Sequence, residues 1–178
     1  MRSRRASHLL SGIALSSALL AVEGAAGGIH WTVPARWQVQ AARPMRMATY
    51  TIPAATGGEA GECGIFYFGK GKGGSVEENL DRWVAQFEPA APVKKTQTSV
   101  NGMPAHRIDV SGTYLSPGGP MMQSQGKKAG WRLLGAIVET SDGLVFFKCT
   151  GPAATIRGAE KEFDELLRSV ARRSGARA

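Results

Sequence analysis

Residues 131–151 read WRLLGAIVETSDGLVFFKCTG, and this stretch decides the fold class. Two apolar runs, Trp131–Glu139 and Leu144–Cys149, flank the turn residues Ser141-Asp142-Gly143. The pattern predicts two antiparallel strands joined as a hairpin. Because both runs are apolar on both faces, we expect them to lie at the centre of a sheet that is covered on both sides.

The residues before this hairpin predict five more strands. Asn101-Gly102 is a strong hairpin turn signal, because both residues tolerate a positive φ. The expected strands are Ile29–Val39 with an interruption at Pro34, Met45–Ile52, Cys63–Phe68, Thr96–Val100 and Ala105–Leu115.

Two helices are expected beside the strands. Ser75 and Glu78 have the spacing of a capping box, and an apolar stripe follows from Val76 to Phe87. A second apolar stripe runs from Ile156 to Arg172. The order β-β-β-α-β-β-β-β-α predicts an α+β domain, a mainly antiparallel sheet with two helices packed on it.

The N-terminus has the pattern of an export signal. Basic residues at positions 2, 4 and 5 precede an uncharged stretch, Leu9–Val22, and the small residues 24–28 follow it. This predicts a signal peptide over residues 1–27, with cleavage near residues 26–28. Residues 28–172 would then form one domain, and residues 173–178 a basic disordered tail. We expect a periplasmic or extracellular protein, with an uncleaved membrane anchor as the alternative.

Composition and charge exclude several classes of protein. The chain has 178 residues, 43% hydrophobic and 20% charged, which is ordinary for one globular domain. Without Arg2, Arg4, Arg5 and Glu23, 19 basic and 13 acidic residues remain, a net charge of +6. These cations are spread over loops and the C-terminal end, so we expect no nucleic-acid binding. Membrane contact is expected only through an uncleaved signal or weak attraction to an anionic surface.

Several segments together carry a resemblance. They are Trp31-Thr32-Val33-Pro34 with Trp37, the helix Val76–Phe87, Val100–Ala105, Gly112-Thr113-Tyr114, and Leu134–Val138 through Phe147 to Gly151-Pro152. This layout resembles a family of exported bacterial proteins of unknown function with the PsbP/Mog-like fold. That fold occurs in an extrinsic photosystem II subunit and in a Ran-binding nuclear-import factor. The resemblance implies a small sheet domain that docks onto something and has no chemistry of its own.

The first functional hypothesis is therefore a non-catalytic binding or assembly domain of the bacterial envelope, with a protein partner and no cofactor. The expected docking surface is the long irregular segment Ser116–Ala129. Its apolar and basic side chains suit a partner surface. They are Pro117, Met121, Met122, Gln123, Lys127 and Lys128.

The second hypothesis is a carrier of a small ligand or of copper in the periplasm. Met45 and Met47, with His30 and His106, would supply thioether and imidazole ligands to copper(I). Core filling is the alternative use of these methionines.

A weak anion site is also conceivable before the first helix. It would combine Lys70, Lys72, Gly73 and Gly74 with the helix N-terminus. Glu77 and Glu78 in the first turn would oppose an anion there.

Cys63 and Cys149 are the only two cysteines of the chain. In an exported protein such a pair suggests a disulfide. The two strands that carry them would have to be antiparallel neighbours for the bridge to form. The alternative is two buried thiols that act as small apolar residues.

The sequence does not predict an enzyme. Gly69, Gly71 and Gly74 match G-x-G-x-x-G, but a hairpin follows the helix where a nucleotide site needs a parallel strand. His106 and Asp109 would point to opposite faces of an expected strand. They therefore cannot form a local catalytic triad with a serine. No paired carboxylates or nucleophile–base pair is visible.

Overall fold

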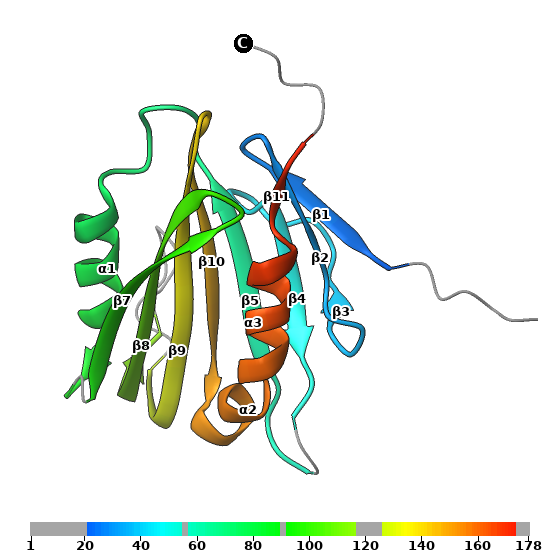
Figure 1. Ribbon diagram of the computed structural model, residues 1–178. Coiled ribbons are helices and arrows are strands. Elements are labelled where there is room, and N and C mark those ends of the chain that lie inside the picture. The colour runs from blue at the N-terminus through cyan, green and yellow to red at the C-terminus, as the bar shows by residue number, and fades with distance from the viewer. Residues whose placement is uncertain (1–20, 55–56, 90–91, 117–125, 174–178) are drawn as a thin grey trace, which may run out of the picture.

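The computed structural model of the protein describes residues 21–54, 57–89, 92–116 and 126–173. Within these ranges the chain forms eleven strands and three short helices (Figure 1). The strands build one eight-stranded sheet and one three-stranded sheet, and every strand pairing is antiparallel. The predicted α+β class is confirmed, with three helices in place of two.

The elements follow the chain in this order. The strands are β1 (Glu23–Ala26), β2 (Ile29–Thr32), β3 (Gln38–Val39), β4 (Ala48–Ile52), β5 (Gly61–Tyr67), β6 (Phe87–Glu88), β7 (Val93–Val100), β8 (Met103–Leu115), β9 (Lys127–Thr140), β10 (Gly143–Pro152) and β11 (Ala171–Arg172). The helices are α1 (Val76–Val84), α2 (Ala153–Gly158) and α3 (Glu160–Ser169).

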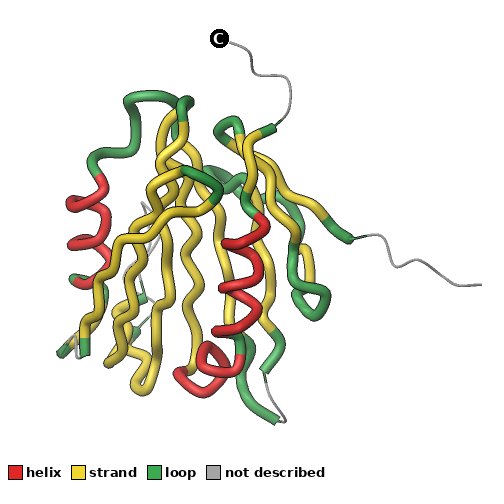
Figure 2. Tube along the Cα trace, in the orientation of Figure 1, coloured by secondary structure: helices red, strands yellow, loops and turns green. Residues whose placement is uncertain are grey.

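The hairpin of β9 and β10 lies at the centre of the large sheet, as predicted. The strand order is β3-β4-β5-β10-β9-β8-β6, and β7 pairs with the remaining length of β8. Phe146 of β10 packs in one apolar cluster with Trp83 of α1, and the next residue, Phe147, packs in another with Phe163 of α3. Consecutive strand residues point to opposite faces, so α1 covers one face and α2 with α3 the other (Figure 2).

The first helix begins as predicted and ends earlier. Ser75 accepts a hydrogen bond from the Glu78 amide while the Glu78 carboxylate accepts one from the Ser75 amide, which confirms the capping box. The helix stops at Val84, and Phe87 enters the two-residue strand β6. The reason is packing: the buried Phe87 ring lies 5.2 Å from the ring of Tyr114 in β8.

The single C-terminal helix expected over residues 156–172 is wrong. The chain forms α2 and α3, which meet at Ala159, and residues 171 and 172 then pair with β2. The side-chain nitrogen of Asn101, Nδ2, donates to the Val170 carbonyl at 2.7 Å, so the β7–β8 turn binds the end of α3. The apolar periodicity was correct, but pairing with β2 takes the last residues into an extended conformation.

The small sheet brings together the first and the last strand of the described chain. β1 pairs with β2 on one side and β11 pairs with β2 on the other. Beyond β11, the amide of Arg173 donates to the Gly28 carbonyl at 2.9 Å. Residues 23–26, which were expected to belong to the signal peptide, therefore form a strand that contacts the domain.

Candidate functional site

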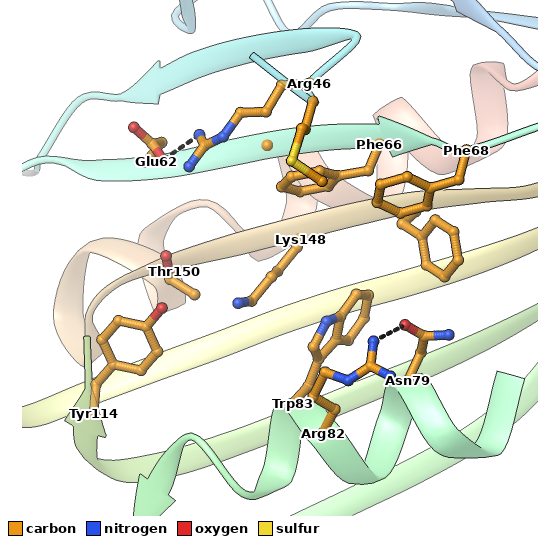
Figure 3. Close-up of a pocket in the computed structure, with 13 residues that line it drawn as sticks. Arg46, Glu62, Phe66, Phe68, Asn79, Arg82, Trp83, Tyr114, Lys148 and Thr150 are labelled. Atoms are coloured by element: carbon orange, nitrogen blue, oxygen red, sulfur yellow. Dashed lines mark hydrogen bonds and ion pairs between the residues drawn. The ribbon is translucent and has the colours of Figure 1, made fainter. Parts of the chain in front are cut away.

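A cavity of about 460 Å³ lies between α1 and the part of the sheet face that α1 leaves uncovered. Its floor comes from β5 and β10, and its rims come from α1 and from the β3–β4 connection (Figure 3). Leu80 and Trp83 attach α1 over β8, β9 and part of β10, so part of the β5 face remains open. The volume falls within the range of about 300–1,000 Å³ that is usual for small-molecule pockets.

Aromatic rings form one wall of this cavity. The Phe68 ring lies 6.4 Å from Phe66 and 5.8 Å from Phe146, and Phe146 lies 6.4 Å from Trp83. Phe68 is 40% exposed, so an apolar surface reaches the solvent at the mouth. A Cβ at Gly64 would stand 2.9 Å from the Phe66 ring, so this glycine leaves room for the ring against the sheet.

Met45 stands on the opposite rim in an unusual conformation. Its φ is 63°, in the left-handed region that non-glycine residues rarely adopt, and 76% of the residue is exposed. The guanidinium of the next residue, Arg46, lies 5.5 Å from the centre of the Phe66 ring. Strained backbone of this kind concentrates at ligand sites, and a methionine adapts its shape to an apolar ligand.

Three cationic side chains and one carboxylate line the cavity. Arg46 binds the carboxylate, Glu62, at 2.5 Å, and Arg82 donates to the amide oxygen of Asn79 at 3.1 Å. The amine of Lys148 lies in the middle of the cavity (Figure 3). It donates to the Gln86 amide oxygen at 2.6 Å. Burial and the nearby positive charge of Arg46 lower the pKa of Lys148 to about 8.

A second, more polar cavity of about 500 Å³ continues this surface. The two share Arg46, Glu62, Tyr114 and Thr150, so they form one groove with an aromatic end and a cationic end. Burial raises the pKa of the shared Tyr114 to about 12, so its hydroxyl stays protonated. We call the two cavities together the α1 groove.

Only two of the six expected docking residues lie within the described part of the chain, and both are in a strand. Pro117, Met121, Met122 and Gln123 lie outside the described residues. Lys127 and Lys128 belong to β9 and pair with Leu115 and Tyr114, which corrects the prediction of an irregular segment up to residue 129. Their amines bind carboxylates, Lys127 that of Glu88 at 2.7 Å and Lys128 that of Glu59 at 3.1 Å.

Of the four candidate copper ligands, the two methionines share the β3–β4 connection and the two histidines lie on other elements. Met45 is on the rim of the α1 groove, and Met47 follows it at the start of the β4 segment. His30 lies in the small sheet, and His106 of β8 contacts the Glu139 carboxylate at 2.6 Å. In the part of the chain that is described, no three His, Cys, Asp or Glu residues form a group that could hold a metal ion.

The glycine segment before α1 has its own internal partner for the helix N-terminus. Lys70, Lys72, Gly73 and Gly74 precede Ser75, whose amide donates to Glu78 Oε2 at 2.8 Å. This hydrogen bond lowers the pKa of the Glu78 carboxyl. An anion at this helix end would therefore have to displace a carboxylate.

Cys63 and Cys149 form a disulfide between neighbouring strands. They lie directly opposite each other in the β5–β10 register, with their Cα atoms 3.9 Å apart. Both residues are buried. The geometric condition stated for the bridge, antiparallel neighbouring strands, is met in the structure.

Most residues of the α1 groove were missed in the sequence; Met45 and Lys128 were named there, for other roles. One signal was present: Lys148 is a single charge inside the apolar run VFFKCT, on a strand expected to be covered on both faces. A buried lysine needs a polar surrounding or a cavity. The rest of the site could not be predicted from neighbouring residues in the sequence. Its side chains come from separate elements, namely the β3–β4 connection, β5, α1 and β10.

No helix within the described ranges is long and apolar enough to cross a membrane.

Comparison with known proteins shows the fold alone. No protein-family model matches the chain, and no curated protein matches it. The solution structure of cyanobacterial PsbP (CyanoP) from Synechocystis sp. PCC 6803 is similar to it, with a TM-score of 0.54 and 10% identity over 92% of this chain and 99% of that one. A crystal structure of a protein of unknown function from Pseudomonas aeruginosa has a TM-score of 0.47 and 14% identity over 81% of this chain and 91% of that one. The fold is therefore PsbP-like.

Proposed function

We propose that the protein is a non-catalytic binding domain that holds a small organic anion with an apolar or aromatic body in the α1 groove. The composition of the aromatic cavity carries the proposal: five aromatic side chains stand beside three cationic ones and a single carboxylate. Cationic groups next to aromatic faces favour an anionic group on an apolar body. This is the carrier hypothesis with an organic anion in place of copper.

The compartment is part of the proposal. The basic and apolar N-terminal pattern favours export, and disulfides persist mainly in oxidising compartments. The Cys63–Cys149 bridge therefore supports a protein of the periplasm or the cell exterior. Docking onto a protein partner through the segment Ser116–Ala129 stays a prediction, because residues 117–125 lie outside the described ranges.

A pair of fluorescent probes tests the proposal. Anilinonaphthalene sulfonate is anionic and aromatic, whereas N-phenyl-1-naphthylamine has a similar body and no charge. We expect saturable binding of the sulfonate to the folded protein, tighter than that of the neutral probe. Arg46→Gln should weaken binding of the sulfonate by about tenfold, which corresponds to about 1.4 kcal/mol. It should have little effect on binding of the neutral probe.

Two further variants complete this experiment. Phe68→Ala should weaken the binding of both probes, because Phe68 is part of the aromatic wall. Arg107→Gln is the matched control, since Arg107 binds Asp164 of α3 on the other face of the sheet. Equal binding of the two probes together with no effect of Arg46→Gln would refute the proposal.

A further inference from the structure

Lys148 differs from other lysines in what its amine contacts. The chain has eight lysines. The amines of Lys95, Lys127 and Lys128 bind carboxylates at 2.7 to 3.1 Å. The Lys148 amine donates instead to the neutral amide oxygen of Gln86 at 2.6 Å, and its side chain lines the aromatic cavity.

The surroundings of Lys148 act on the pKa of its amine in opposite directions: burial and Arg46, the larger effects, lower it, and Glu62 raises it. Arg46 is positively charged and lowers the pKa of the amine, as burial does. Glu62, the one carboxylate of the cavity, is bound by Arg46 at 2.5 Å and by Arg43 at 2.8 Å. The centre of the Tyr114 ring lies 5.9 Å from the amine. With the pKa of Lys148 at about 8, about a tenth of the amine is neutral near pH 7.

This surrounding suits a nucleophile better than an ionic anchor. An amine that serves only as a cation is normally kept charged by a carboxylate partner. Lysines that attack carbonyl groups are desolvated in apolar pockets or lie next to another cation, and Lys148 meets both conditions. Arg46, which binds Glu62, and Arg82, which binds the Asn79 side chain, remain permanently charged and still attract an anionic group of the ligand.

We propose that Lys148 captures an aldehyde or ketone that carries an anionic group, as an imine within the α1 groove. This rests on the proposed function and names its ligand class. The neutral amine adds to the carbonyl carbon, a C=N bond replaces the C=O bond, and the oxygen leaves as water with both amine protons. The step needs no oxidant or reductant. The imine nitrogen then takes up one proton from the solvent, and the Gln86 oxygen that accepts from the amine is placed to accept from the protonated imine.

Pyridoxal 5′-phosphate serves as the probe, since it is an anionic aromatic aldehyde. The whole protein is incubated with it, reduced with borohydride and analysed by intact mass and peptide mapping. We expect one adduct per chain, located at Lys148, and an imine absorbance before reduction. Lys148→Met and Lys148→Arg should lose this adduct, whereas Lys72→Met, in the exposed glycine segment, should keep it.

The alcohol analogue, pyridoxine 5′-phosphate, separates the two proposals. We expect it to displace anilinonaphthalene sulfonate from the wild type and from folded Lys148→Arg. Displacement by the alcohol without an adduct at Lys148 would overturn the imine inference and leave the proposed function standing. Adducts spread equally over Lys148 and the surface lysines would also overturn it. Failure of both compounds to bind would overturn both proposals.

Discussion

Gly135 lies so close to the indole ring of Trp83 that a Cβ on Gly135 would stand 2.6 Å from the ring. Trp83 is buried and is one of the side chains that attach α1 to the sheet. The width of the α1 groove therefore depends on the missing side chain of a glycine in the central strand β9. A methyl group there would push the helix outward or tilt the ring.

Gly135→Ala tests this relationship. We expect a loss of about 1–3 kcal/mol in the free energy of unfolding, the usual cost of overpacking a core, and weaker binding of the anionic probe. Urea denaturation and the fluorescence titration measure the two effects. Gly158→Ala is the matched control, because a methyl group on Gly158, at the end of α2, would meet no atom within 4 Å. It should leave stability unchanged or raise it slightly; equal stabilities of the two variants would contradict the packing argument.

Loss of the disulfide should destabilise the domain strongly. Cys63 and Cys149 are 86 residues apart in sequence, and the chain-entropy model gives about 4–5 kcal/mol for a loop of that length. The double variant Cys63→Ala/Cys149→Ala should unfold at a much lower urea concentration than the wild type. A reductant should destabilise the wild type and leave the double variant unaffected. Two proteins of equal stability in oxidising buffer would argue against a bridge.

The lowered pKa of Lys148 predicts a pH dependence of stability with a defined sign. The unfolded chain keeps its proton up to the ordinary value of 10.5, whereas the folded chain loses it near 8. Between these values the unfolded state binds more protons, so this lysine makes the free energy of unfolding rise with pH. Tyr114, with a pKa of about 12, does not titrate in this window.

The variant Lys148→Met isolates the contribution of this lysine to the pH dependence of the free energy of unfolding. Below pH 8 we expect the variant to be more stable than the wild type, by about 1–2 kcal/mol after allowance for the partial exposure of the side chain. The difference should shrink as pH rises through this window. Comparing the two proteins by urea denaturation at each pH cancels the other titrating groups. A constant difference would show that the amine keeps its proton.

Local patterns predicted much of the fold. Asn101 and Gly102 adopt φ values of 47° and 75°, as their turn requires, and the apolar runs of β9 and β10 are central. These features depend on neighbours in sequence. Pairings between distant segments could not be read in this way: β2 lies between β1 and β11, so His30 pairs with both Ala25 and Ala171. The candidate site belongs to this second kind, since the contacts of Lys148 with Arg46 and Gln86 join segments that are far apart in sequence.

The strand β1 leads to a prediction about processing of the N-terminus. Trp31 is fully buried; its indole nitrogen donates to the Tyr50 hydroxyl at 3.0 Å and its ring lies 5.3 Å from Phe147. Gly24 of β1 lies directly against that indole, and Ala26 is buried as well. Cleavage near residues 26–28 would remove this cover from Trp31.

We therefore expect any processing of the N-terminus to leave β1 in place, with the first residue of the processed chain at or before Val22. The Val22 carbonyl accepts a hydrogen bond from the Val33 amide at 2.8 Å, which fixes the start of this segment. Intact mass of the protein from the envelope fraction determines the cleavage point. A chain that begins at Gly28 should be less stable by about 2 kcal/mol than one that begins at Ala21, because apolar surface around Trp31 becomes exposed. Its tryptophan emission should shift to the red, and equal stability of the two chains would show that β1 is dispensable.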